Sequence, residues 1–180
     1  DEQKIGWQVL ALYEDPRGGI WVGQQGMGAL AFIRDGVTNA YRIPGAAAAM
    51  DVRCLTRDAA GAMWFGTAGD GLYRVEEERA TRFARTNGLP SEVVWSLLAE
   101  PDGTVWIGTS GGGISRWRAG ELRSFGLAEG MPNDTVSQIF PEGADHLWMG
   151  THGGIFRVAK REIEAVARGA KARFEGIRFD

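Results

Sequence analysis

The stretch Val105–Ser115, VWIGTSGGGIS, is the clearest candidate for a chemical site, because it could be a glycine-rich loop that holds a phosphate. It nearly fits the pattern G-x-x-x-x-G-K-[ST], in which backbone N–H groups surround the phosphates and a lysine reaches them. Ile114 stands at the lysine position, so the required cation is missing. Similar stretches occur at three other places in the chain. The stretch therefore indicates a turn between two strands, with no phosphate chemistry.

The two histidines and the single cysteine are the other residues whose types could support metal or nucleophilic chemistry. His146 and His152 lie six residues apart, without a cysteine or a convincing set of carboxylates nearby. A metal site needs three or four convergent ligands. Cys54 stands in a predicted inner strand, where a small packing residue is expected. No Ser–His–Asp order or paired carboxylate stands out, so the sequence predicts no catalytic residue, no metal and no cofactor.

The glycine-rich stretches belong to a repeat that is marked by a tryptophan. Four of the seven tryptophans stand at intervals of 43, 42 and 42 residues: Trp21, Trp64, Trp106 and Trp148. A valine lies twelve residues before each of them, and an acidic residue lies six before. A glycine lies two residues after each tryptophan: Gly23, Gly66, Gly108 and Gly150. We expect these tryptophans and glycines to be structural, with the indole rings packed between neighbouring repeats.

The period of about 42 residues predicts an all-β fold made of β-propeller blades, each with four short antiparallel strands. The expected blades span approximately residues 5–45, 46–88, 89–130 and 131–180. Together they would form a single propeller domain, or a propeller fragment, over residues 1–180. In the last repeat Ile163, Val166 and Ala167 have helical spacing, and Gly169 can end a helix. The sequence therefore predicts a short helix over about 160–168, inserted before a last strand at about 172–179.

One variable position in the repeat supplies the candidate ligand-binding residues. Eleven residues before the successive tryptophans stand Leu10, Arg53, Trp95 and Ser137. Propellers bind ligands on one face near the axis, where the inner strands end. Arg53, Trp95 and Ser137 could therefore meet an anionic or sugar-like ligand. The alternative is that they are ordinary residues of the surface or the central pore.

Composition excludes several classes of partner. The 180 residues carry a net charge of −3, so no basic field attracts nucleic acid. No apolar run approaches the roughly 20 residues that cross a bilayer, and we expect no membrane contact by this segment. The single cysteine excludes an internal disulfide.

The segment SLLAEPDGTVWIGTSGGGISRW, residues 96–117, resembles the two-component regulator propeller repeat, whose units run roughly as l.eD..G.lWiGT..GGl.r. The links NGLP and EGMP resemble the segment that joins blades in that family. The likeness extends over about residues 9–158. The first repeat departs from it, because it has GQQGMG in place of GT..GG. It also lacks the arginine that the later repeats carry as Arg74, Arg116 and Arg157.

The resemblance implies a sensor module, periplasmic or extracellular, within a membrane-anchored bacterial signalling protein. In such proteins a small β-sandwich, a membrane helix and a kinase or cyclase follow the propeller. The segment itself would be non-catalytic, and it would bind a small molecule, a glycan or the adjacent domain of the same protein. A protein-interaction or assembly scaffold is the alternative function. A lyase or lactonase of the streptogramin lyase type is a third, which would need histidines or acids converging on the axis.

The number of repeats bears on how the ring is completed. Propellers of this family typically have seven blades, whereas this chain has four repeats. It is therefore expected to be a fragment of a larger ring, or to complete a ring by self-association. A four-bladed ring that closes by itself is the third and least expected alternative.

Overall fold

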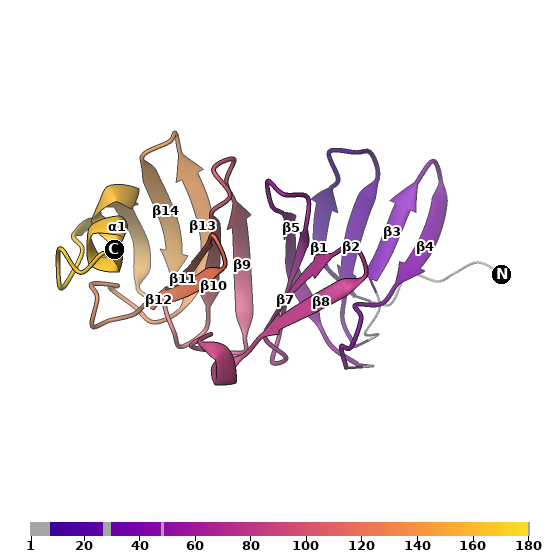
Figure 1. Cartoon of the computed structure of the whole chain (residues 1–180), viewed down its shortest axis with the longest axis horizontal. Coiled ribbons are helices and arrows are strands. Elements are labelled where there is room, and N and C mark those ends of the chain that lie inside the picture. Colours follow the sequence, from indigo (N-terminus) through magenta and orange to yellow (C-terminus); the bar gives the residue numbers. More distant parts are fainter. Residues whose placement is uncertain (1–7, 27–29, 48, 180) are drawn as a thin grey trace.

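The computed structural model describes residues 8–26, 30–47 and 49–179. This part of the chain contains four separate four-stranded antiparallel sheets, and each sheet is built from consecutive strands. We call the sheets blades 1 to 4 in chain order, and Figure 1 shows them side by side along the molecule. The predicted all-β fold of propeller blades is confirmed.

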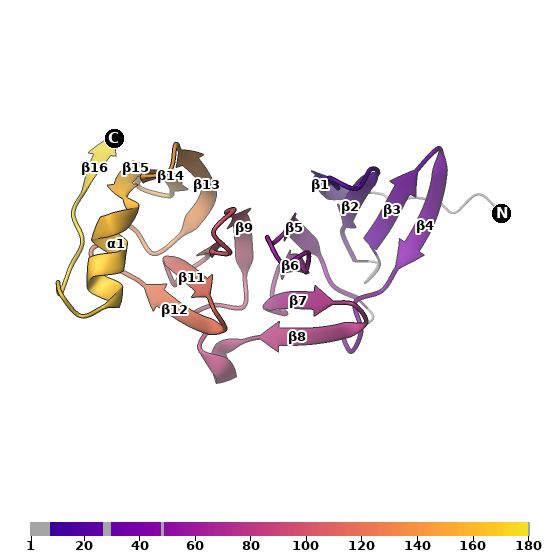
Figure 2. The same cartoon turned by 45° about the horizontal axis from the view of Figure 1, so that its top comes forward.

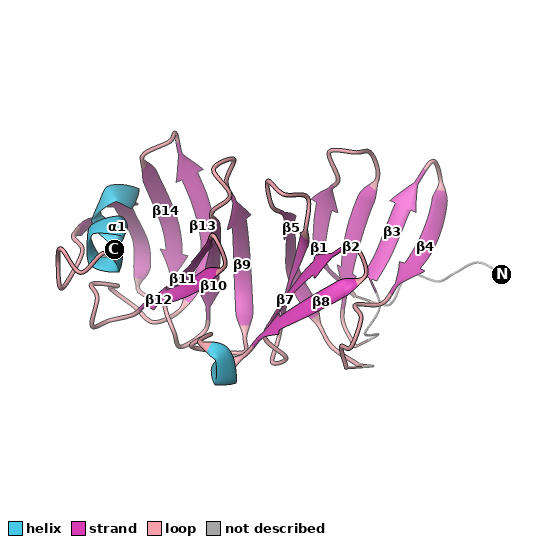
Figure 3. Ribbon diagram, viewed as in Figure 1, coloured by secondary structure: helices cyan, strands magenta, loops and turns pink. Residues whose placement is uncertain are grey.

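Every blade is a meander in which each strand pairs with the one before it (Figure 3). Blade 1 consists of β1 (Val9–Glu14), β2 (Ile20–Gln24), β3 (Leu30–Arg34) and β4 (Val37–Tyr41). Blade 2 consists of β5 (Val52–Arg57), β6 (Met63–Thr67), β7 (Leu72–Glu76) and β8 (Arg79–Phe83). Blade 3 consists of β9 (Val94–Ala99), β10 (Val105–Thr109), β11 (Ile114–Arg118) and β12 (Glu121–Phe125). Blade 4 consists of β13 (Val136–Glu142), β14 (His146–Thr151), β15 (Gly154–Ala159) and β16 (Gly176–Phe179).

The blades form an arc in which each inner strand contacts the next. β1 contacts β5, β5 contacts β9, and β9 contacts β13. Figure 2 shows these four strands along the inner side of the arc, with blade 1 and blade 4 at its two ends. A 3-10 helix (Arg85–Asn87) follows blade 2. Since contacts run between neighbours in sequence, each blade is stabilised mainly by the blades before and after it.

The predicted helix is present as α1 (Lys160–Ala167), which lies between β15 and β16. Its buried residues are Ile163, Val166 and Ala167, the three that the sequence placed on one face. The last strand begins four residues later than expected, at Gly176. Phe174 explains the delay, because its ring is buried and its backbone N–H donates to the Glu129 carbonyl instead of pairing with β15. No helix in the described ranges is long and apolar enough to cross a membrane.

Helix α1 also fastens blade 4 to blade 3 through charged groups. Arg116 of blade 3 lies 2.5 Å from the carboxylate of Glu164 in the helix. Lys160, the first residue of the helix, forms an ion pair with Glu100 of blade 3. Both blade 3 partners have side chains that are about one-tenth exposed, so these pairs are better shielded from solvent than ordinary surface ion pairs.

A hydrogen bond from the recurring tryptophan is present in all four blades. In each case the indole N–H donates to a carboxylate six residues earlier: Trp21 to Asp15 at 3.0 Å, Trp64 to Asp58 at 2.8 Å, Trp106 to Glu100 at 2.7 Å and Trp148 to Glu142 at 2.6 Å. The acid stands at the turn between the first two strands of its blade. The bond therefore ties that turn to the centre of the second strand.

The indole rings differ in how deeply they are buried. Trp64 and Trp106, in the middle blades, are 0% and 1% exposed and lie in the cores shared with the following blade. Trp21 and Trp148 are only partly buried. Trp148 stacks on Phe179 of its own blade, with ring centroids 5.3 Å apart. Full burial of the ring is thus found only in the two middle blades, and Trp21 stays partly exposed although blade 2 follows it.

The glycine two residues after the tryptophan lets the next blade approach. A Cβ built on Gly108 would lie 2.4 Å from the Ser96 hydroxyl and 2.6 Å from the Val136 carbonyl oxygen, which belongs to the following blade. On Gly150, in blade 4, the nearest atom would be the Gln138 Cβ at 3.3 Å. Gly108 therefore has no room for a side chain, whereas Gly150 does.

We predict that Gly108→Ala and Gly150→Ala differ in their effect on stability although they stand at the same repeat position. Gly108→Ala should lower the free energy of unfolding by about 1–3 kcal/mol, because the added methyl group overpacks the junction with blade 4. Gly150→Ala should change it by less than about 0.5 kcal/mol. Urea unfolding followed by tryptophan fluorescence measures both, and equal losses would contradict this account of the glycines.

The carboxylate of Glu142 gives a pH-dependent prediction. Hydrogen bonds from Arg157 and then from Trp148 lower the pKa of Glu142 to about 2, below the value of an unfolded chain. Its pairing therefore stabilises the fold fully above about pH 4 and is lost as the pH falls toward about 2. Arg157→Gln should move the Glu142 pKa back toward the usual value. The free energy of unfolding should then depend less on pH between about pH 4 and 2.

The measurement is an NMR titration of the Glu142 side-chain carbon, combined with urea midpoints from pH 2 to 6. Trp148→Phe is the matched control, because it removes the weaker of the two donors and should raise the pKa by less. A Glu142 pKa that is unaffected by loss of Arg157 would refute the assignment.

Candidate functional site

A cavity of about 320 Å³ lies at the inner side of the arc, and all four inner strands line it. The lining consists of residues 10–12 of β1, 53–55 of β5, 95–97 of β9 and 138–140 of β13. We call it the axial cavity. The contacts between successive inner strands place the variable repeat position beside it.

That variable position is a β-bulge in every blade. In β5, Val52 pairs with Thr67 and Cys54 pairs with Gly66, so Arg53 has no partner across the ladder. The same register shift leaves Trp95 of β9 without a partner, and likewise Leu10 and Ser137 in the outer two blades. At a bulge, side chains no longer alternate regularly between the two faces of the sheet, and the side chain of the bulge residue points in a different direction. Its type can therefore vary without disturbing the blade.

The structure brings two of the three predicted ligand-binding residues together. The Arg53 guanidinium carbon lies 4.4 Å from the centroid of the Trp95 ring, a cation–π contact between blades 2 and 3. Ser137 is not part of the lining. Its hydroxyl donates to the Gly150 carbonyl at 3.2 Å, and the neighbouring Gln138 lines the cavity in its place.

The charge of Arg53 is not compensated within the described ranges. No carboxylate there pairs with it, and the axial cavity has no acidic residue in its lining. Arg53 Nε, Trp95 Nε1 and Ser96 Oγ are buried, and none has a hydrogen-bond partner among the residues described. Buried donors without an acceptor cost free energy. A ligand that supplies acceptor atoms here would remove this cost, which would favour its binding. The site is suited to an anionic or oxygen-rich ligand.

Cys54 lies in the same lining but has no sign of a reactive thiol. Burial raises the pKa of the Cys54 thiol to about 12, so the thiolate is not populated near neutral pH. A Cβ on Gly66 would lie 2.4 Å from its sulfur. These contacts agree with a packing residue.

The two histidines are not brought together. His146 begins β14 and His152 directly follows its other end. Within residues 8–26, 30–47 and 49–179, no group of three or more histidine, cysteine, aspartate or glutamate side chains is placed to hold a metal ion.

Two polar residues of the axial cavity were not predicted as binding residues, namely Ser96 and Gln138. They stand ten residues before their tryptophans, at the position that holds alanine and cysteine in the first two repeats. The change from small apolar to polar side chains along that column is the signal that could have revealed them.

We predict that two serines near the axis respond differently to removal of the hydroxyl. Ser96→Ala should change the free energy of unfolding by less than about 0.5 kcal/mol, because the Ser96 hydroxyl has no partner in the described structure. Ser137→Ala should lower it by about 1 kcal/mol, because a hydrogen bond to Gly150 is lost. Urea unfolding of both variants is the measurement. A larger loss for Ser96→Ala would mean that its hydroxyl has a structural role.

Comparison with known proteins identifies the repeat and the fold. Residues 88–111 match the family described as two component regulator propeller. No curated protein matches the sequence. The extracellular domain of the putative hybrid two component system BT3049 from B. thetaiotaomicron superimposes with a TM-score of 0.75 at 23% identity. That match covers 96% of this chain and 23% of the neighbour, so the chain spans about a quarter of the length of that extracellular domain.

Other similar structures have different activities. Virginiamycin B lyase from Staphylococcus aureus gives a TM-score of 0.73 at 16% identity, covering 99% of this chain and 57% of the lyase. PorZ, a bacterial surface component of the type-IX secretion system of Porphyromonas gingivalis, gives 0.67 at 16% identity, covering 95% and 26%. At these identities the likeness concerns the fold alone. The chain thus has the β-propeller fold, and its residues 88–111 carry a two component regulator propeller repeat.

Proposed function

We propose that this chain is the propeller part of an extracytoplasmic bacterial sensor, and that it binds an anionic, oxygen-rich small molecule such as a sugar acid at the axial cavity. In this proposal the segment does not catalyse a reaction. Ligand binding between the inner strands of blades 2 and 3 would alter how these blades pack, and the adjacent output domain would detect the change.

The observation that carries the proposal is the uncompensated arginine. Arg53 stacks on Trp95 and has no carboxylate partner in the described ranges. A guanidinium group forms strong charge-assisted hydrogen bonds with a carboxylate. An indole face suits the apolar side of a sugar ring. The combination therefore favours a ring that carries a negative charge.

The similarity to extracellular domains of two-component systems supports the placement outside the cytoplasm. The two component regulator propeller repeat supports a role in signalling. The lyase neighbours keep an enzymatic alternative open, but the described residues bring no histidine to the axial cavity. Sensing is therefore the function that these residues support best.

The experiment is isothermal titration calorimetry with D-galacturonate and with D-galactose, which differ in the carboxylate. We expect D-galacturonate to bind more tightly than D-galactose. Arg53→Met should weaken D-galacturonate binding by at least about tenfold, or about 1.4 kcal/mol, and abolish the preference for the acid. Trp95→Leu should weaken both sugars. Arg118→Met is the matched control, because Arg118 pairs with Asp102 and is not part of the cavity lining.

Equal affinity for parent and Arg53→Met, or no binding of either sugar at millimolar concentration, would contradict the proposal.

The scaffold alternative rests on a different observation. Several large apolar side chains of blade 4 are exposed, namely Phe140, Ile155, Ile177 and Phe179. Absence of sugar binding together with concentration-dependent association in sedimentation velocity would favour that alternative, including completion of a ring by a second copy. Turnover of a bound sugar ester or lactone would instead favour the enzyme.

A further inference from the structure

One face of the blade 4 sheet is not covered by another blade within the described ranges. Residues that pair across neighbouring strands lie on the same face of a sheet, so the register assigns each side chain to a face. Four large apolar side chains share this face and are well exposed: Phe140 58%, Ile155 49%, Ile177 52% and Phe179 43%. The opposite face packs on blade 3 and is buried, with Leu147 and Met149 at 0% exposure. We call the uncovered side the free face of blade 4.

The corresponding face is covered in the two blades before it. Ile155 pairs with Gly150, just as Leu72 pairs with Gly66 in blade 2 and Ile114 with Gly108 in blade 3. Leu72 and Ile114 are both 0% exposed, because each lies in a core shared with the following blade. Ile155 has the same place in its sheet and lacks only that cover.

The glycines at the repeat position after the tryptophan show the same difference. A Cβ built on Gly23, Gly66 or Gly108 would lie 2.6 Å from an atom of the valine in the next inner strand, namely Val52, Val94 or Val136. A Cβ on Gly150 would meet only Gln138 and Ser137 of its own blade, at 3.3 Å or more. Gly150 therefore leaves the free face flat at the point where the other three glycines receive a valine.

Blade 1, at the other end of the arc, presents the opposite half of such a junction. In each later blade, three apolar side chains pack against the preceding blade, and in blade 3 these are Val94, Leu97 and Val105. The same repeat positions of blade 1 hold exposed side chains: Val9 46%, Leu12 68% and Ile20 36%. Val22 of the same blade is buried, so the exposed part runs along β1 and the start of β2.

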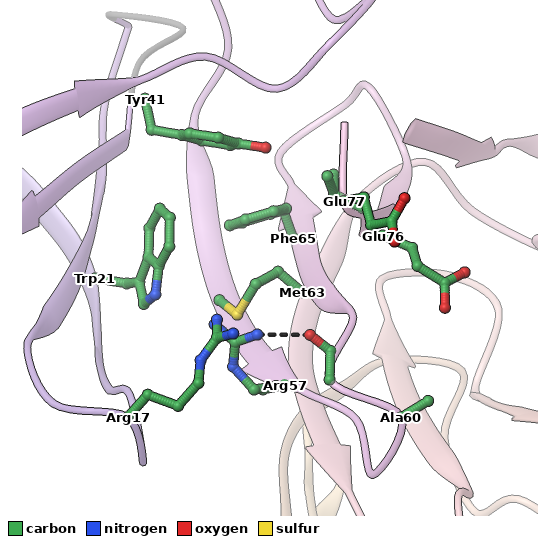
Figure 4. A pocket seen from close by; sticks show the side chains of 11 residues that line it. Arg17, Trp21, Tyr41, Arg57, Ala60, Met63, Phe65, Glu76 and Glu77 are labelled. Atoms are coloured by element: carbon green, nitrogen blue, oxygen red, sulfur yellow. Dashed lines mark hydrogen bonds between the residues drawn. The ribbon is translucent and has the colours of Figure 1, made fainter. Parts of the chain in front are cut away.

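The junction between blades 1 and 2 shows how the two halves fit together. Figure 4 shows Trp21 and Tyr41 of blade 1 facing Phe65 and Met63 of blade 2. These side chains belong to one core that both blades share. The chain makes junctions of this kind three times, and its two ends carry the two halves of a fourth. The partner that supplies the half missing from blade 4 is therefore a second copy of this chain.

We propose that the free face of blade 4 docks blade 1 of a second copy, head to tail, in the manner of the three internal junctions. The two copies use different surfaces, so the contact is heterologous. β1 of the second copy then lies beside β13, whose residues 138–140 line the axial cavity. The self-association expected from the number of repeats would use this contact.

The contact does not require a ligand in the axial cavity. Failure of association leaves the sugar-binding proposal unaffected, and absence of sugar binding leaves this contact unaffected. Association and sugar binding can therefore be measured separately on the same preparations.

The test is sedimentation velocity of the 180-residue chain from micromolar to millimolar concentration. We expect a species of twice the chain mass, whose proportion rises with concentration. Leu12→Glu on blade 1 and Ile155→Glu on blade 4 should each weaken association at least about tenfold, because each buries an unpaired charge in the contact. Leu127→Glu is the matched control, because Leu127 is 53% exposed and lies in the loop between blades 3 and 4, outside both surfaces.

Gly150→Ala tests the same contact with the smallest change. The methyl group has room within one chain, so the free energy of unfolding at dilution should stay the same. It would meet the inner strand of the docked copy, so association should weaken.

Mixing the two charged variants tests the head-to-tail arrangement. Leu12→Glu keeps blade 4 intact and Ile155→Glu keeps blade 1 intact, so an equimolar mixture can form one intact contact. The mixture should therefore associate more strongly than either variant alone. The proposal is overturned if the chain remains monomeric at millimolar concentration. It is also overturned if Leu12→Glu associates as the parent does, which would indicate a contact between two copies of blade 4.

Discussion

The hydrogen bond between each recurring indole and a carboxylate six residues before it is the constraint on which the other features depend. A buried indole N–H without an acceptor costs free energy, and the acid at the turn supplies an acceptor to the recurring tryptophan in all four blades. Because that acid stands at the turn, the bond fixes the first two strands relative to each other. The glycine beyond the tryptophan then lies against the inner strand of the following blade, where only a hydrogen atom fits. The burial of the indole ring, the position of the turn between the first two strands and the close approach of the following blade thus all follow from one local arrangement.

Much of this arrangement could be predicted from the sequence, because the repeat shows the same residue types at fixed spacing. The spacing of Trp64 and Trp106 indicated the blades, and the pattern of Ile163, Val166 and Ala167 indicated the helix. Features that depend on contacts between distant residues could not be predicted. The last strand is short because Phe174 turns into the core beside Glu129. The partial exposure of Trp21 and Trp148 likewise depends on their neighbours in space, since Trp148 is covered by Phe179 of its own blade.

The candidate sites were predictable to a different extent. The variable position that includes Arg53 and Trp95 was visible in the sequence, but its cause, a bulge in every inner strand, is a property of the strand register. The axial cavity thus lies where the chain departs from its own repeat. Positions that hold the blades together are constrained, and variation is confined to positions that the packing leaves free.

Helix α1 gives the two ends of the arc different means of attachment. At one end the helix clamps blade 4 to blade 3 through Glu164 and Lys160, and a continuous core fills the junction. At the other end blades 1 and 2 share a core, and the buried ion pair between Arg57 and Asp15 joins them directly. Loss of the helix would therefore uncover the side of the C-terminal core that Ile163 now covers, whereas the N-terminal junction depends on its own strands and turns.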